Sequence, residues 1–235
     1  MTDDRSPTER DVPDGLSQRA HRTVIGVLGL FLPVLLYVIA GLRPTTGLQA
    51  WILLNSVSAY YYTGAVGIFV GVLFSLALFL FTYRGYVGVW ADRIVGMTGG
   101  AAAVMVALFP TGTPDGLTGP AWWNKATGRI HTVAAIVLFV TFILFSVWLF
   151  RKSNIPRRPD RPPPKRLRDD ICLACGLVMI AAVLWAGIAA LGDGPIFIPE
   201  TVAMLGFAVS WLVKGEAHQI VRDAATRLMR KTAGD

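Results

Sequence analysis

Three side chains that could do chemistry stand within or beside long apolar runs of this sequence: His131, Glu200 and Ser58. Ionisable groups inside apolar runs are energetically costly in a membrane, so His131 and Glu200 are candidate functional residues. Ser58 is a candidate through its hydroxyl. A histidine and a carboxylate at similar depth could pair, relay a proton, or supply two ligands to a metal that needs a third. The structural alternative, which we favour, is an interhelical hydrogen bond that fixes the register of two helices.

Ser58 belongs to the stretch SVSAYYYTG, in which three consecutive tyrosines precede an apolar run. Successive residues of an α-helix point about 100° apart, so Tyr60, Tyr61 and Tyr62 cannot form one catalytic face. Aromatic side chains are enriched where transmembrane helices meet water. We therefore predict that the tyrosines form a collar at the lipid interface. One hydroxyl, from Ser56, Ser58 or a single tyrosine, remains a candidate to turn inward toward His131 and Glu200.

The elements that must position these residues are membrane helices. The chain has 235 residues, of which 54% are hydrophobic and only 16% charged, whereas soluble domains have about 25% charged residues. Crossing a bilayer takes about 20 apolar residues. The sequence predicts an all-α, polytopic bundle of six transmembrane helices in a domain at residues 22–214, after a disordered segment at 1–21 and before a basic amphipathic tail at 215–235. The predicted spans are residues 23–42, 64–83, 91–110, 130–150, 171–191 and 195–213.

Glycines recur at helical spacing in two of these spans, Gly64, Gly67 and Gly71 in the second and Gly96, Gly99 and Gly100 in the third. Small residues let the backbones of membrane helices approach closely. We expect both sets to pack helices within the molecule.

The basic residues indicate the orientation of the chain. Of 22 Lys and Arg, all but Arg43, Lys125 and Arg129 fall on one side of the predicted membrane. Cytoplasmic loops retain positive charge, so both termini are expected in the cytoplasm. The high Arg content suggests a GC-rich bacterial genome, which makes the plasma membrane the expected location.

The most basic connection, residues 151–170, is rich in proline and is expected to be extended. Juxtamembrane basic clusters bind anionic lipid head groups. The expected partners are thus membrane lipids, with a second copy of the chain or another membrane protein as further possibilities. Nucleic acid is excluded because no aromatic residues are interleaved with the charge. The predicted lipid-interface residues outside the tyrosine stretch are Trp122, Trp123, Arg157, Arg158, Arg161, Lys165, Arg166 and Arg168.

The sequence gives little support for a metal or a cofactor. Cys172 and Cys175 form a C-x-x-C pair, but there is no second pair and no histidine nearby, so we expect neither a zinc site nor a redox centre. No phosphate-binding loop, nucleophile elbow or metalloprotease motif occurs, which excludes the common soluble enzyme classes.

Four segments, SVSAYYYTG, ALFPTGTPDG, RIHTVAAIVLF and ETVAMLGFAVSWLVKGEA, resemble those of bacterial six-helix membrane proteins of the domain of unknown function 998 type, akin to the DRAM and Sfk group. This resemblance implies the six-helix architecture and no defined activity.

A second resemblance is to the intramembrane hydrolases of the alkaline ceramidase and adipoQ-receptor superfamily, in which Ser58, Asp92 and His131 would take three of the active-site positions. The predicted topology opposes it, because Asp92 and His131 fall near opposite faces of a core about 30 Å thick. We expect a non-enzymatic membrane protein acting through lipid or protein contacts, with a polar cluster in the outer leaflet. The alternatives are an intramembrane lipid hydrolase and a small proton-coupled transporter.

Overall fold

The computed structural model describes residues 15–83, 90–153, 155 and 157–217. This part of the chain contains helices and irregular segments and no strand, which confirms the all-α prediction. The six α-helices are α1 (Gly15–Leu42), α2 (Val66–Phe81), α3 (Trp90–Leu108), α4 (Lys125–Val147), α5 (Pro163–Leu191) and α6 (Phe197–Lys214). Three short 3₁₀ helices complete the elements: η2 (Ser58–Tyr62), η3 (Leu149–Arg151) and η4 (Arg158–Asp160).

Five of the helices are long and apolar enough to cross a membrane, and α2 is apolar but has only 16 residues. Helices form because lipid offers the backbone no hydrogen-bond partners, so each apolar run must satisfy its own N–H and C=O groups. At 1.5 Å per residue α2 is about 24 Å long. The short 3₁₀ helix η2 precedes α2 in the chain and packs against it.

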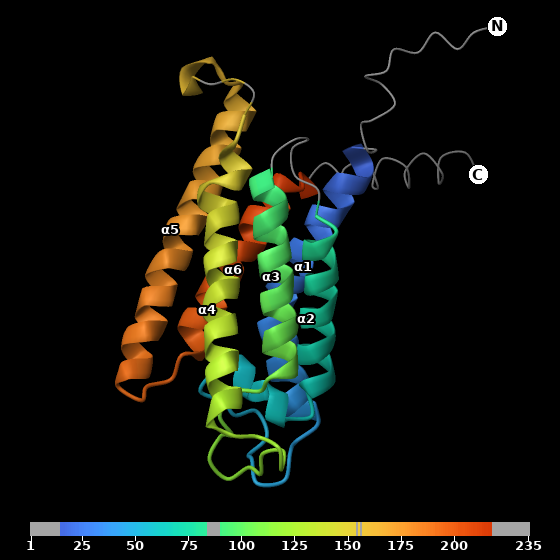
Figure 1. Ribbon diagram of the computed structural model, residues 1–235, viewed down its shortest axis with the longest axis vertical. Coiled ribbons are helices and arrows are strands. Elements are labelled where there is room, and N and C mark those ends of the chain that lie inside the picture. The colour runs from blue at the N-terminus through green and yellow to red at the C-terminus, as the bar shows by residue number, and fades with distance from the viewer. Residues whose placement is uncertain (1–14, 84–89, 154, 156, 218–235) are drawn as a thin grey trace, which may run out of the picture.

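The helices form a closed ring in which each packs against the next in the chain and α6 returns to α1 (Figure 1). Helix α5 packs against α4 and α6 and lies at the outside of the bundle. Across the ring, the Phe142 and Phe207 rings are stacked with centroids 3.8 Å apart, and the Ser146 hydroxyl donates to that of Ser210 at 2.7 Å. These contacts join α4 directly to α6.

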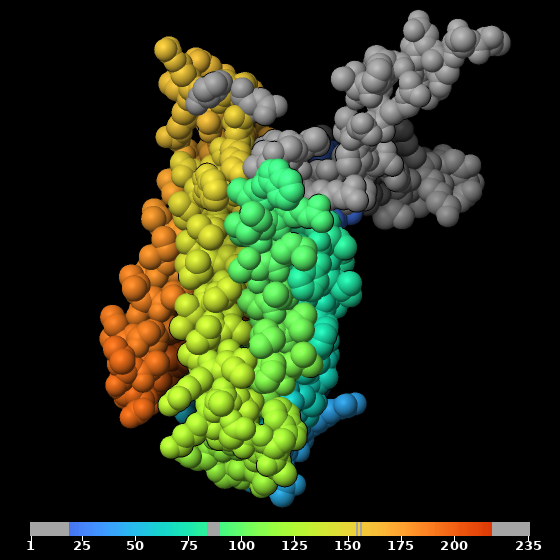
Figure 2. All heavy atoms as spheres, in the orientation of Figure 1, coloured from blue at the N-terminus to red at the C-terminus, as the bar shows by residue number. Residues whose placement is uncertain are grey.

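The two ends of the bundle differ in charge. One end, called the basic end, holds the start of α1 and the end of α6, where Arg19 forms an ion pair with Glu216 at 3.0 Å. The opposite end, called the loop end, carries only Arg43, Lys125 and Arg129 among the described basic residues. The segment between α3 and α4, yellow-green in the space-filling view, covers much of the loop end (Figure 2). The separation of charge seen in the sequence is thus a separation between the ends of the fold.

The glycines of α3 pack closely, as predicted, whereas two of those in α2 do not. A Cβ atom added at Gly96 would lie 2.9 Å from the Leu80 carbonyl oxygen, and one at Gly99 would lie 2.5 Å from the Thr141 methyl group. By contrast, Gly67 and Gly71 face open space, with no atom within 4 Å of an added Cβ. Close packing by glycine therefore joins α3 to α2 and α4, and it comes from the glycines of α3 rather than from those of α2.

Three helices begin several residues earlier than the hydrophobic runs indicated, among them α4, which starts at Lys125 rather than at residue 130. Helix α1 starts at Gly15, within the segment expected to be disordered, and α5 starts at Pro163 rather than at residue 171. Proline is well tolerated in the first turn of a helix, because the N–H it lacks would have no partner there. Ion pairs then stabilise the polar first turns of α5, as described below. The predicted tail at 215–235 lies outside the described residues from position 218 onward.

Candidate functional site

Three hydrogen bonds join the start of α6 to the SVSAYYYTG stretch and to Asn55, the residue just before it. The Asn55 carbonyl accepts from the backbone N–H groups of Ile196 at 2.7 Å and Phe197 at 2.8 Å. In return, Oε2 of Glu200 accepts from the N–H of Val57 at 2.7 Å. The first N–H groups of a helix have no partner within the helix, so Asn55 caps α6 from another segment. Glu200 thus fixes the start of η2 against α6.

The three tyrosines of η2 have separate environments. A 3₁₀ helix has three residues per turn, so consecutive side chains point about 120° apart. Tyr60 is completely buried and packs on Phe197, with centroids 5.7 Å apart, whereas Tyr61 lies edge-on to Phe69. The Tyr62 hydroxyl donates to the Thr111 carbonyl at 2.6 Å, and burial raises the pKa of this phenol.

This arrangement changes the collar that the sequence suggested. Tyr61 and Tyr62 keep partial exposure at the loop end, but Tyr60 lies inside the fold rather than at its surface. The reason is the 3₁₀ geometry, which turns one of three successive residues toward the core. Of the tryptophans, Trp122 is 55% exposed, whereas Trp123 is partly buried and donates its indole N–H to the Pro110 carbonyl at 3.1 Å.

Between the helices lies a cavity of about 60 Å³, one end of which is formed by η2 and the first turn of α6. Ser58 and Glu200 are the only polar side chains among the described residues that line it. Five helices supply apolar walls that include Leu32, Leu73, Val106, Leu138 and Phe207. Since one water needs roughly 10–15 Å³ by the same kind of measure, there is room for several non-hydrogen atoms. The polar groups thus lie at the loop end, with the apolar walls reaching toward the middle of the bundle.

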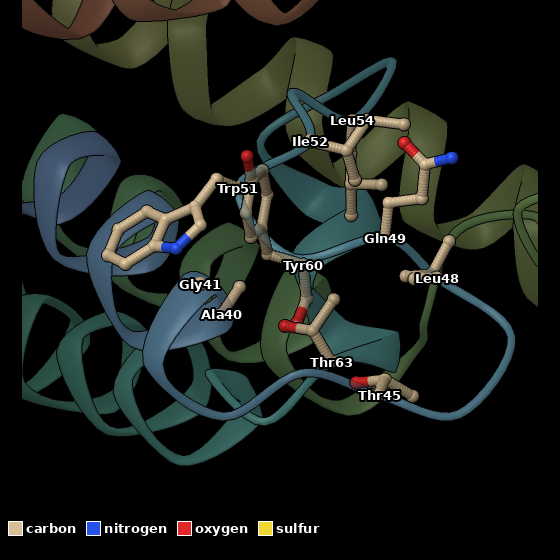
Figure 3. A pocket seen from close by; sticks show the side chains of 10 residues that line it. All are labelled: Ala40, Gly41, Thr45, Leu48, Gln49, Trp51, Ile52, Leu54, Tyr60 and Thr63. Atoms are coloured by element: carbon tan, nitrogen blue, oxygen red, sulfur yellow. The ribbon is translucent and has the colours of Figure 1, made fainter.

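A second, smaller pocket lies on the other side of η2, between the end of α1 and residues 45–54. Its volume is about 10 Å³, and Figure 3 shows the side chains around it, among them Trp51, Gln49, Tyr60 and Thr63. A volume of this size corresponds to about one water molecule. η2 therefore separates a small polar pocket, lined by Tyr60, from the larger apolar cavity, lined by Ser58.

His131 does not line the apolar cavity. Its Nδ1 hydrogen bonds to the Phe109 carbonyl at 2.6 Å, and a carbonyl can only accept, so Nδ1 carries the proton. This bond links the start of α4 to the residue that follows α3. The structure therefore brings Ser58 and Glu200 to one cavity and gives His131 a backbone partner of its own. His131 and Glu200 thus each hydrogen bond to the backbone of another segment of the fold. Such bonds are of the kind that we favoured from the sequence over a catalytic role.

The basic connection between α4 and α5 is held by ion pairs within the protein. Asp169 is buried with 2% exposure, and it pairs with Arg161 at 2.9 Å and with Lys165 one helical turn earlier. Arg168 pairs with Glu216, and Arg158 with Asp170. Of the six basic residues in this connection that we predicted to bind lipid head groups, four are thus paired with carboxylates. The spacing of Lys165 and Asp169 is a sequence signal for such a pair, since residues four apart on a helix are neighbours.

Of the remaining two, Arg157 is exposed and Arg166 is partly buried. Asp92, in the first turn of α3, is 2% exposed and pairs with Lys152 at 3.2 Å. It lies at the basic end, whereas His131 bonds to the residue just beyond the other end of the same helix. Asp92 and Phe109 are 17 residues apart along this helix, which is about 26 Å at helical rise. The arrangement of Ser58, Asp92 and His131 that the hydrolase resemblance would require is not formed.

Metal-ligating residues are likewise dispersed in the part of the chain that the structure describes, where no three His, Cys, Asp or Glu side chains come together in a potential metal site. Cys172 and Cys175 are both free and buried.

Comparison with known proteins gives one match. No curated protein and no solved structure matches the chain. A model of the family DUF998, described as a protein of unknown function, matches residues 57–214. The match begins at Val57, whose N–H is bound by Glu200, and it ends at the last residue of α6. It therefore contains η2, five of the six helices and both polar groups of the cavity. Because the match covers more than half of the sequence, the chain belongs to the DUF998 family.

Proposed function

We propose that this protein is a non-enzymatic integral membrane protein that binds a small amphiphilic, lipid-like molecule in the cavity between its helices. The observation that supports this proposal is that polar and apolar side chains line different parts of the cavity. Ser58 and Glu200 stand at the loop end, and apolar side chains from five helices form the rest. Ligand pockets in proteins commonly combine apolar walls with a few polar groups that orient the ligand.

The same geometry favours binding over chemistry. Glu200 is held by the Val57 N–H, and His131 by the Phe109 carbonyl. Each of these hydrogen bonds joins two segments of the fold, so each side chain has a structural task. The hydrolase alternative would need Asp92 and His131 in one site, and they lie near opposite ends of α3.

The proposal includes an orientation. We infer that the basic end faces the cytoplasm of a bacterial plasma membrane and that the cavity opens near the outer leaflet, since positive charge is retained on the cytoplasmic side. The exposed Arg157 would then meet anionic head groups. Both native cysteines are buried, so single cysteines can be introduced at exposed sites. In intact cells an impermeant maleimide should label Asp115→Cys, whereas Asp160→Cys should react only after permeabilisation.

The binding function can be tested with an aliphatic diazirine alcohol of six carbons, photoactivated on the purified full-length protein. Peptide mass spectrometry should find the label on cavity-lining residues such as Leu73 and Met204. The variant Ala135→Phe fills the cavity and should remove most of that label. Ile136→Phe is the matched control, because Ile136 is the next residue of α4 and is 54% exposed. Equal cavity labelling in the two variants would contradict the proposal.

A further inference from the structure

Two interactions stabilise a negative charge on the Glu200 carboxylate. It lies in the first turn of α6, where the aligned peptide dipoles stabilise an anion. Its Oε2 accepts the Val57 N–H at 2.7 Å, within the range of charge-assisted hydrogen bonds. These two interactions oppose the cost of placing the carboxylate beside apolar side chains.

That charge has no cationic partner in the described part of the protein. Every ion pair between described residues involves Asp92, Asp169, Asp170 or Glu216, all at the basic end. None of the described residues that line the cavity is Lys, Arg or His. The basic side chains of the loop end, Arg43, Lys125 and Arg129, are exposed.

A charge beside apolar walls is costly unless it is paired. A ligand that brought a cation to Glu200 would supply the partner that the protein does not. The Ser58 hydroxyl lines the same end of the cavity and can accept a hydrogen bond, whereas a protonated primary amine has three N–H donors. An apolar chain on that amine would lie along the walls formed by residues such as Leu73 and Phe207.

Building on the function proposed above, we propose that the ligand of this cavity is a hydrophobic cation, a protonated amine with a short apolar chain. Its ammonium group would lie against Glu200 and Ser58. A carboxylate of the same chain length would be repelled by Glu200, and an alcohol would lack the charge. Since a hydrogen bond to a charged group is about twice as strong as a neutral one, the amine should bind about tenfold or more tightly than the alcohol.

The test compares hexylamine, hexanol and hexanoate, which share one chain and differ in charge. Each is titrated against the purified full-length protein in a non-ionic detergent, with the rise in melting temperature as the readout of binding. Glu200→Gln keeps an acceptor for the Val57 N–H but removes the charge. Asp193→Asn removes an exposed carboxylate at the same end of the bundle, at a position with φ of 55° that asparagine tolerates.

We expect hexylamine to stabilise the wild type and Asp193→Asn at concentrations about tenfold lower than hexanol does, and Glu200→Gln to lose this preference. If hexanol or hexanoate binds the wild type as tightly as hexylamine, the cation proposal is wrong, while binding in the cavity still stands. If none of the three stabilises the wild type, both proposals fail. The wild-type comparison decides the matter even if Glu200→Gln does not fold.

Discussion

Replacing Glu200 with alanine tests whether the contact between η2 and α6 stabilises the fold. The change removes the acceptor of the Val57 N–H, and Val57 is only 5% exposed, so water replaces the lost partner poorly. Leaving a buried donor unsatisfied costs about 2 kcal/mol. For a domain of this size the melting temperature should fall by roughly 4 to 8 °C.

The assay is thermal unfolding of the purified protein in detergent, followed by circular dichroism. The amide oxygen of Glu200→Gln can still accept from Val57, so this variant should lose less than half as much stability as Glu200→Ala. Asp193→Asn serves as the control for removal of an exposed carboxylate at the loop end. If Glu200→Ala is as stable as the wild type, the hydrogen bond does not hold η2 to α6, and our account of the SVSAYYYTG stretch is wrong.

Three further predictions concern the rest of the fold. Asp169→Ala leaves Arg161 and Lys165 without this partner and should lower the free energy of unfolding by about 3 kcal/mol. Asp170→Ala breaks an exposed ion pair and should lower it by less than about 1 kcal/mol. Chemical denaturation measures both changes. In the same assay Gly99→Ala should destabilise by about 1 to 3 kcal/mol, because the new Cβ would lie 2.5 Å from a Thr141 methyl group, and Gly67→Ala should not destabilise. The raised pKa of Tyr62 means that its stabilising effect is complete below the unfolded-state pKa, about 10, and is lost as pH rises through the folded-state value. Between about pH 9 and 11, the melting temperature should therefore fall more steeply with pH for the wild type than for Tyr62→Phe.

Results that would contradict these predictions are equally direct. Equal stability of the Asp169 and Asp170 variants would mean that burial does not strengthen the inner pair. A stable Gly99→Ala would mean that α3 and α4 can separate at little cost. If the melting temperatures of the wild type and Tyr62→Phe fall equally with rising pH, Tyr62 does not contribute to the loss of stability in alkali.

The sequence predicted the six helices because crossing lipid imposes a length and a composition that can be read residue by residue. It could not predict where α5 begins. The apolar run starts at residue 171, but the ion pairs of Asp169 stabilise a polar start at Pro163. Hydropathy measures the part of a helix that lipid requires, and tertiary contacts determine how far the helix continues beyond it.

The candidate site was predictable in part. Glu200 and Ser58 stood out by residue type, and they do line one cavity. Their partners did not stand out, because the Val57 N–H and the Phe109 carbonyl are backbone groups that every residue carries. The inward turn of Tyr60 follows from a 3₁₀ helix, which the sequence pattern does not distinguish from an α-helical turn.

The central claim is that the cavity beside Glu200 holds a small hydrophobic cation. The most direct test is a pair of electron-density maps of the full-length protein, crystallised with and without hexylamine. We expect density that starts within hydrogen-bond distance of Glu200 and Ser58 and continues toward Phe207, and that is absent without the amine. The claim would be contradicted if Leu73 and Phe142 filled the space in both maps, or if the amine bound only on the lipid-facing surface.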